Sequence, residues 1–225
     1  MVNTPNRSSI SVVWLLIASA AALWSIAYAD QSEFGFDEGF HYHRISPALP
    51  AQAAAGQVEV LELFWYGCPH CYVFEKHLSN WETGKADHVK FTRMPAVMNR
   101  NWMPHARAYY ALEQLGEVER LHSLFFDAIH DQGRRLRNLQ SISRFLGHHG
   151  VDTDVFEKAY NSSAVTEKIE HARQLARNAG ANSVPTIIIN GKYRSTASDA
   201  GGHALLLQLI DSLVIQEIKA SRSED

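Results

Sequence analysis

Cys68 and Cys71 are the only thiols of this 225-residue chain, and two residues separate them. A disulfide between them would close a very short loop, and the stability gained from a disulfide by loop closure grows with loop length. A structural crosslink is therefore a poor explanation for the pair. Two thiols at this spacing suit disulfide exchange, in which one thiolate forms a mixed disulfide and the second thiol resolves it.

The residues around the pair indicate how it would be positioned. The nearly all-apolar run 58–65 before the cysteines is typical of a buried central strand. After them, Phe74, Leu78 and Trp81 recur at the spacing of one buried helix face. Cys68 would then lie at a helix N-terminus, where unpaired N–H groups and the helix dipole lower the pKa of a thiol.

Each residue of the motif has an expected role. Pro69 suits the first helical position, because the N–H that it lacks would be unpaired there. His70 in the first turn can donate to the Cys68 thiolate or offset its charge. We expect Cys68 to be the exposed nucleophile and Cys71, one turn into the helix, to be the buried resolving thiol. A stabilised Cys68 thiolate would favour the reduced protein and make the disulfide a strong oxidant.

Half of a zinc site has the same cysteine spacing, so a metal is the alternative interpretation. Zinc requires two further ligands, but the sequence has no second cysteine pair, and His41 and His43 lie far from the motif. The other histidines are scattered, and we expect pairs such as His148–His149 to face solvent. The sequence therefore predicts no metal and no cofactor besides the Cys68–Cys71 disulfide.

The rest of the chain supplies further strands and a long helical stretch. Val89–Met94 alternates as a strand would, and Tyr42–Ile45 is a shorter candidate. The apolar run Val184–Ile189, then Asn190-Gly191 and Lys192–Arg194, predicts a hairpin. A final helix with an apolar face should begin near Leu205 and fray after Lys219. Between the strands, helices are expected at Pro104–Leu115, Glu117–Ile129, Asn138–Gly147, Asp152–Tyr160 and Ser163–Asn178.

The composition fits a globular protein and gives no sign of nucleic-acid binding. The chain is 46% hydrophobic and 20% charged, and its formal net charge is −3. A nucleic-acid-binding domain would instead carry an excess of basic residues.

The N-terminus has the pattern of an export signal. Arg7 is the only charged side chain before Asp30, an apolar run starts at Ile10, and residues 27–29 read Ala-Tyr-Ala, as a cleavage site would. We expect residues 1–29 to be a cleaved signal peptide. The alternative is an uncleaved anchor, since Ile10 to Ala29 is just long enough to span a bilayer. Either way the folded part would lie in an oxidising compartment.

Two stretches of this sequence resemble the DsbA family of bacterial periplasmic disulfide oxidases. The first runs from Val60 through Cys68-Pro69-His70-Cys71 to Tyr72, and the second runs from Val184-Pro185 to Tyr193. The helical stretch between them is also similar, so the resemblance covers nearly all of the chain after residue 40. The central Pro-His pair is specific to this branch, because thioredoxins usually carry Gly-Pro there.

The resemblance implies an α/β fold, namely a thioredoxin domain with an inserted all-helical subdomain. The thioredoxin domain would comprise residues 30–95 and 180–225, with the helical insertion at 96–179. The protein would be a periplasmic oxidase that donates its disulfide to unfolded or newly exported cysteine-containing proteins. A DsbB-like, quinone-linked membrane oxidase would reoxidise it, and a monomer is the expected state.

The resemblance also assigns roles to residues outside the cysteine motif. Pro185 would be a cis-proline facing the disulfide, with Val184 before it, and both would contact substrate. The alternative is that the two residues are an ordinary strand-opening dipeptide.

Glu62 matches a buried acid of the family that accepts or relays the proton of Cys71. The alternative is that Glu62 lies at a strand end with its carboxylate in water. Arg93 stands where the family more often has lysine, and we expect it to hold Glu62 ionised, which argues against proton relay. Gly67, directly before the nucleophile, stands where the family usually has a bulky aromatic residue.

Two other functions remain open at this point. An isomerase or reductase could use the same fold, although an isomerase resembling DsbC would need a dimerisation domain before the redox domain. Only about 28 residues separate Asp30 from the first core strand, too few for such a domain, and Val184 replaces the threonine usual in isomerases. A chaperone or metal carrier is the alternative from a different functional class.

Overall fold

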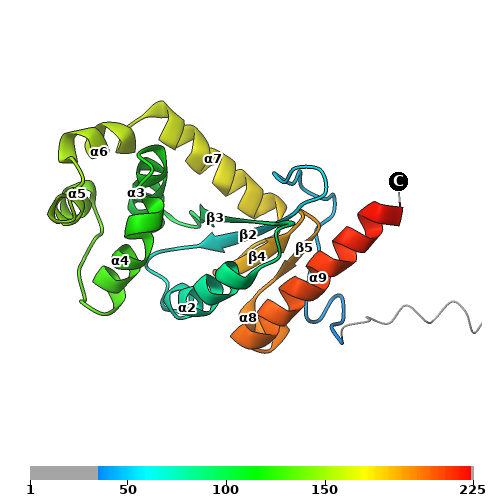
Figure 1. Ribbon diagram of the computed structural model, residues 1–225. Coiled ribbons are helices and arrows are strands. Elements are labelled where there is room, and N and C mark those ends of the chain that lie inside the picture. Colours follow the sequence, from blue (N-terminus) through cyan, green and yellow to red (C-terminus); the bar gives the residue numbers. More distant parts are fainter. Residues whose placement is uncertain (1–34, 224–225) are drawn as a thin grey trace, which may run out of the picture. The chain divides into compact units, whose positions relative to one another are not determined.

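A mixed five-stranded sheet forms the centre of the molecule (Figure 1). The computed structural model describes residues 35–223, so the expected signal peptide 1–29 lies outside the described residues. Strands β2 and β3 are parallel, and the other neighbours are antiparallel. The strand order is β1 (His43–Arg44), β5 (Tyr193–Ser195), β4 (Thr186–Ile189), β2 (Val58–Phe64) and β3 (Val89–Pro95).

Strand β2 is buried on both faces, as its apolar sequence predicted. Successive side chains of a strand point to opposite faces. Leu61 and Leu63 therefore share one face, where they pack in a cluster with Ala176 and Ala179 at the end of α7 (Ser163–Asn178). Glu62 points to the other face.

Helices α2 (Pro69–Gly84) and α9 (His203–Ser223) pack together on the side of the sheet opposite α7 (Figure 1). Their contact includes the rings of Phe74 and His203, whose centroids are 5.3 Å apart. The face that carries Glu62 is therefore the one covered by α2, the helix that begins with the cysteine motif.

All the regular structure between β3 and β4 is helical, as predicted (Figure 1). Asn138 and Asp152 cap the helices that follow them, and Gly180, at a φ of +65°, follows α7. The boundaries of the insertion at residues 96 and 180 remain predictions. Before α7, the helical elements are a 3₁₀ turn (Arg100–Trp102), α3 (Met103–Gln114), α4 (Val118–His130), α5 (Leu139–His148) and α6 (Thr153–Tyr160).

The predicted hairpin is present, with Asn190 and Gly191 both at positive φ between β4 and β5. A side chain at Gly191 would overlap the backbone of Leu49, so glycine is required there. The sequence did not predict the 3₁₀ turn at Arg100–Trp102, the short helix α8 (Ala197–Ala200) or the second cis peptide bond, at Ser46–Pro47.

The expectation that the chain frays after Lys219 was wrong, because α9 continues to Ser223. Residues 219–223 are exposed, so this last turn does not depend on packing; the hydroxyl groups of Ser221 and Ser223 donate to the carbonyl oxygens of Ile218 and Ala220. Within residues 35–223, no helix is both long enough and apolar enough to cross a membrane.

Candidate active site

Cys68 lies at the junction between the central sheet and α2, as the sequence predicted. It is the N-cap residue of the helix, with extended φ and ψ of −90° and 116°, and Pro69 follows in the first turn. The backbone N–H of Cys71 donates to the Cys68 Sγ at 3.4 Å. The same Sγ lies 3.4 Å from the carbonyl oxygen of Val184. The thiol is thus held between the first turn of α2 and the loop that leads into β4.

The groups of α2 near Cys68 stabilise its thiolate form, whereas the Val184 carbonyl oxygen accepts a hydrogen bond only from the thiol. A hydrogen bond from the Cys71 thiol, the backbone N–H groups of Cys71 and His70, and the charge of His70 together lower the pKa of Cys68 to about 6. Burial opposes them, because it disfavours the charged form. At neutral pH the thiolate is therefore the main form of this residue.

Cys71 has the opposite character. It is fully buried in the core cluster, and burial is the main reason that its pKa is raised, with additional contributions from Cys68 and Glu62. Cys68 is less exposed than we expected, since only 7% of the residue is accessible. The Val184 loop covers part of it. Pro69 and His70 are exposed.

The peptide bond between Val184 and Pro185 is cis, which confirms the prediction from the resemblance. Val184 is half-buried and packs against the core cluster that contains both cysteines, and Pro185 is buried. Strand β4 begins at Thr186. The dipeptide therefore lies beside Cys68 although the two are 116 residues apart in the sequence.

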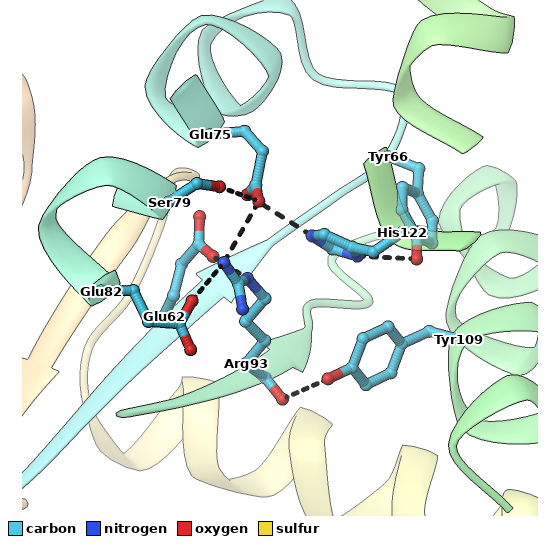
Figure 2. Close-up of polar contacts among 8 residues, drawn as sticks. All are labelled: Glu62, Tyr66, Glu75, Ser79, Glu82, Arg93, Tyr109 and His122. Atoms are coloured by element: carbon cyan, nitrogen blue, oxygen red, sulfur yellow. Dashed lines mark hydrogen bonds and ion pairs between the residues drawn. The ribbon is translucent and has the colours of Figure 1, made fainter. Parts of the chain in front are cut away.

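Glu62 is buried in the middle of β2, with 1% of the residue exposed, so the alternative of a carboxylate in water was wrong. It is in register with Arg93 of the parallel strand β3. Figure 2 shows that Arg93 also reaches two carboxylates of α2. Arg93 Nε lies 3.6 Å from Glu62 Oε2. Arg93 Nη2 lies 3.1 Å from both Glu75 Oε1 and Glu82 Oε2.

The shared arginine does not hold Glu62 ionised, and this corrects our expectation. Burial and the nearby Glu75 raise the pKa of Glu62 to about 8, and Arg93 offsets only part of that rise. The physical reason is that one cation serves three carboxylates, and it makes hydrogen bonds to Glu75 and Glu82 but not to Glu62. The objection to proton transfer by Glu62 is therefore removed. None of the hydrogen bonds of the two thiols within residues 35–223 involves Glu62.

A second set of buried polar groups extends this network through His122 to Tyr66, two residues before Cys68 (Figure 2). Glu75 Oε2 lies 3.4 Å from His122 Nε2, and His122 Nδ1 lies 2.9 Å from the Tyr66 hydroxyl. Burial alone would raise the pKa of Glu75, but His122, Arg93 and Ser79 together lower it. Sequence reasoning missed Glu75 and His122. The sequence feature that could have revealed Glu75 is its position as a charged residue beside Phe74, the first residue of the predicted apolar helix face.

Gly67 has a structural explanation. A Cβ at this position would overlap the Trp65 indole, which lies over the glycine. Trp65 in turn stacks on Trp102, with ring centroids 4.4 Å apart and an interplanar angle of 5°. The aromatic surface next to the nucleophile is therefore supplied by Trp65 and Trp102 rather than by residue 67.

No group of three or more metal-binding side chains within residues 35–223 is arranged to hold an ion. The dithiol at the strand–helix junction, facing a cis-proline, defines the class of thiol–disulfide oxidoreductases with a thioredoxin fold. Residues 59–210 match the family described as the DSBA-like thioredoxin domain. The chain belongs to this family.

Relatives and solved structures agree with this assignment. The chain is 40% identical over 182 residues to a thiol:disulfide interchange protein DsbA of Azotobacter vinelandii, covering 81% of this chain and 85% of that protein. It is 36% identical to the Pseudomonas syringae pv. tomato DsbA, covering 92% and 98%. The crystal structure of Pseudomonas aeruginosa DsbA superposes with a TM-score of 0.80 at 35% identity, covering 85% of this chain and all of that one. These matches confirm the thioredoxin fold with a helical insertion.

Proposed function

We propose that this thiol–disulfide oxidoreductase works as an oxidase, which donates the Cys68–Cys71 disulfide to newly exported proteins with reduced cysteines. The observation that carries the proposal is the contrast between the two thiols: the pKa of Cys68 is lowered to about 6, whereas that of Cys71 is raised. A stable Cys68 thiolate favours the reduced protein, and the disulfide form then gives up its oxidising equivalents readily.

In the proposed reaction, a substrate thiolate attacks the Cys68 Sγ of the disulfide, and the Cys68–Cys71 bond breaks. Cys71 leaves with the electron pair and takes up a proton, because its buried position disfavours the thiolate. A second substrate thiolate then attacks the substrate sulfur of the mixed disulfide and releases Cys68 as the thiolate. The substrate loses two electrons and gains a disulfide, and the enzyme becomes the dithiol.

Five neighbouring residues have roles in this proposal. Glu62 donates the proton that Cys71 takes up, since its pKa of about 8 leaves it largely protonated at neutral pH. His70 stabilises the Cys68 thiolate, and Pro69 keeps the first turn of α2 in place. Val184 and Pro185 hold the substrate chain beside Cys68, which is supported by the 3.4 Å approach of the Cys68 Sγ to the Val184 carbonyl oxygen.

We further propose the cellular setting that the resemblance implies. Residues 1–29 are a signal peptide removed on export, and the mature monomer acts in the periplasm. Residues 30–95 and 180–225 form the thioredoxin domain around the insertion 96–179. A DsbB-like membrane oxidase restores the disulfide and passes the electrons to quinone. Support for export comes from the signal pattern in the sequence.

The direct test is to mix the oxidised protein with a reduced, unfolded protein that has paired cysteines. We expect rapid oxidation of the substrate by the native protein and none by Cys68→Ser or Cys71→Ser, because neither variant can form the disulfide. Offered a substrate that already contains a disulfide, the Cys68 thiolate of Cys71→Ser should attack it, release one substrate thiol and remain trapped as a mixed disulfide. Titration against glutathione gives the potential of the pair. A potential at or below that of the glutathione pool would support a reductase instead, and the absence of any exchange would support a binding protein.

A further inference from the structure

A pocket with a basic rim adjoins the redox centre on the side of the helical insertion. Its volume is about 570 Å³, enough for one or two amino-acid side chains. Gly67, directly before the nucleophile, forms part of its wall, as do Trp65 and His105. A substrate chain that is bonded through its own cysteine to the Cys68 sulfur extends by about 3.3 Å per residue. The two or three substrate residues next to that cysteine therefore reach this pocket.

Four arginines line the pocket, and none of its lining residues within the described part of the chain is acidic. The arginines are Arg100, Arg134, Arg135 and Arg137, all of them exposed. None of the four forms an ion pair with a carboxylate of residues 35–223, whereas Arg44, Arg93, Arg120, Arg173 and Arg177 do.

The carboxylates nearest in the sequence, Asp127 and Asp131, interact with Tyr72 instead. Neither carboxylate forms an ion pair with the four arginines of the pocket within residues 35–223.

The segment that carries three of these arginines is fixed to the helical core. His105 Nε2 lies 2.6 Å from the Leu136 carbonyl oxygen, and the Arg134 N–H donates to the Ala128 carbonyl at 2.8 Å. The Leu136 side chain is buried in the core cluster. The arginines thus project from a backbone that is held in place, and the pocket is part of the folded structure.

Trp65 Nε1 and His105 Nδ1, in residues that line the pocket, are buried atoms without a hydrogen-bond partner among residues 35–223. Burial lowers the pKa of His105 to about 4, so its ring is neutral. Because a carbonyl oxygen only accepts, His105 Nε2 carries the proton and Nδ1 is an acceptor. Trp65 Nε1–H is a donor. Both atoms are inaccessible to solvent, so an occupant of the pocket contacts the arginines at its rim rather than these two groups.

We propose that this pocket is a carboxylate-binding subsite for the polypeptide that reacts at Cys68, so that cysteines flanked by Asp or Glu are preferred substrates. The proposal rests on the proposed function and adds a substrate class to it. Guanidinium groups bind carboxylates with paired hydrogen bonds. A basic surface also attracts an acidic chain before contact and raises the association rate.

The test compares three reduced dithiol peptides of one sequence, with Glu, Gln or Lys on both sides of the cysteine that attacks Cys68. The rate of their oxidation by the oxidised protein is measured by stopped-flow fluorescence. At low ionic strength we expect the Glu peptide to react about threefold to tenfold faster than the Gln peptide, and the Lys peptide to be slowest. The preference should largely disappear in about 1 M salt, where charges are screened within about 3 Å.

The double variant Arg135→Gln/Arg137→Gln should lower the ratio of the Glu and Gln rates towards one. The matched control is Arg173→Gln/Arg222→Gln, which removes two exposed arginines from α7 and α9. Figure 1 places the connection between α4 and α5 far from the C-terminal end of α9. The control should retain the preference. Because each ratio is measured within one protein preparation, a change in the active fraction does not alter it.

Equal rates for the Glu and Gln peptides with the native protein would overturn the subsite, and so would a preference that survives in Arg135→Gln/Arg137→Gln. Failure to oxidise any of the three peptides would instead overturn the proposed oxidase function, and the subsite with it. The two failures are therefore distinguishable in the same experiment.

Discussion

Arg93 and Glu62 are partners in register on adjacent parallel strands, and their closest atoms, Nε and Oε2, are 3.6 Å apart. This distance is too long for a hydrogen bond, so the interaction is ionic only. Arg93 makes its hydrogen bonds to Glu75 and Glu82 of α2 instead (Figure 2). Glu62 is consequently a buried acid next to a cation that is mostly engaged elsewhere, which explains the rise of its pKa to about 8.

Replacing Arg93 by methionine should raise the pKa of Glu62 further and destabilise the protein. The substitution leaves buried carboxylates without their cation, which typically costs about 3–5 kcal/mol. Arg93→Lys is the control: it keeps the charge but cannot form the same branched contacts, so its effect should be smaller. The pH dependence of attack by Cys71 on a mixed disulfide at Cys68 reports the pKa. An unchanged pH profile in Arg93→Met would refute the coupling.

Glu62→Gln should remove a pH dependence of folding stability. The pKa of Glu62 is about 8 in the folded protein and about 4.3 in an unfolded chain. Between these values the folded state binds more protons, so native stability falls as pH rises from about 4.3 to about 8. We therefore compare the unfolding free energy of Glu62→Gln with that of the native protein. The value for the variant minus the native value should increase by more than about 1 kcal/mol across this pH window and stay constant above about pH 8. Denaturant melts at several pH values measure it, and a constant difference would exclude a raised pKa.

The reduced protein should gain stability relative to the oxidised protein as pH rises from about 6 to about 8.5. The pKa of Cys68 is lowered to about 6 when folded and is about 8.5 when unfolded. The unfolded state binds more protons in this window, so the folded thiolate form is favoured as pH rises. After allowance for solvent screening, the gain is roughly 2 kcal/mol, similar to the loop-closure effect of so short a disulfide.

Because these two effects are similar in size, the slope with pH is the decisive quantity. Paired denaturant melts of the oxidised and reduced proteins give it, and the oxidised form is the internal control because it has no Cys68 thiolate. His70→Ser should reduce the slope, since the charge of His70 helps to lower the pKa of Cys68. Parallel pH profiles for the two redox forms would mean that Cys68 is an ordinary thiol.

Gly67→Ala should displace the Trp65 ring from its stack on Trp102. The added methyl group would occupy the space of the indole, and overpacking of this kind costs about 1–3 kcal/mol. Gly84→Ala is the matched control, because nothing lies within 4 Å of a Cβ there. A change in tryptophan fluorescence with Gly67→Ala, together with a lower melting temperature, is the expected result. Equal stability of the two variants would contradict this account of Gly67.

The sequence by itself determined the redox centre and the elements that carry it. The apolar run before Cys68, the spacing of Cys68 and Cys71, and Pro69 between them predict a buried strand followed by a helix with a thiol at its N-terminus, and the structure has both elements. The helices of the insertion and the Asn190-Gly191 hairpin were also predictable, because capping residues and turn residues act over a few positions.

Tertiary structure alone decided which distant groups surround the thiols. The approach of Val184 to Cys68 was expected only from the family resemblance. The sharing of Arg93 among three carboxylates and the cover of Trp65 over Gly67 were not expected, because they depend on how strands and helices pack. Periodicity identifies a buried face but does not specify which residues meet across it. A pKa is set by burial and by charges within a few ångströms, so the ionisation of Glu62 was wrongly predicted from Arg93 alone and was decided by the neighbours that α2 brings to it.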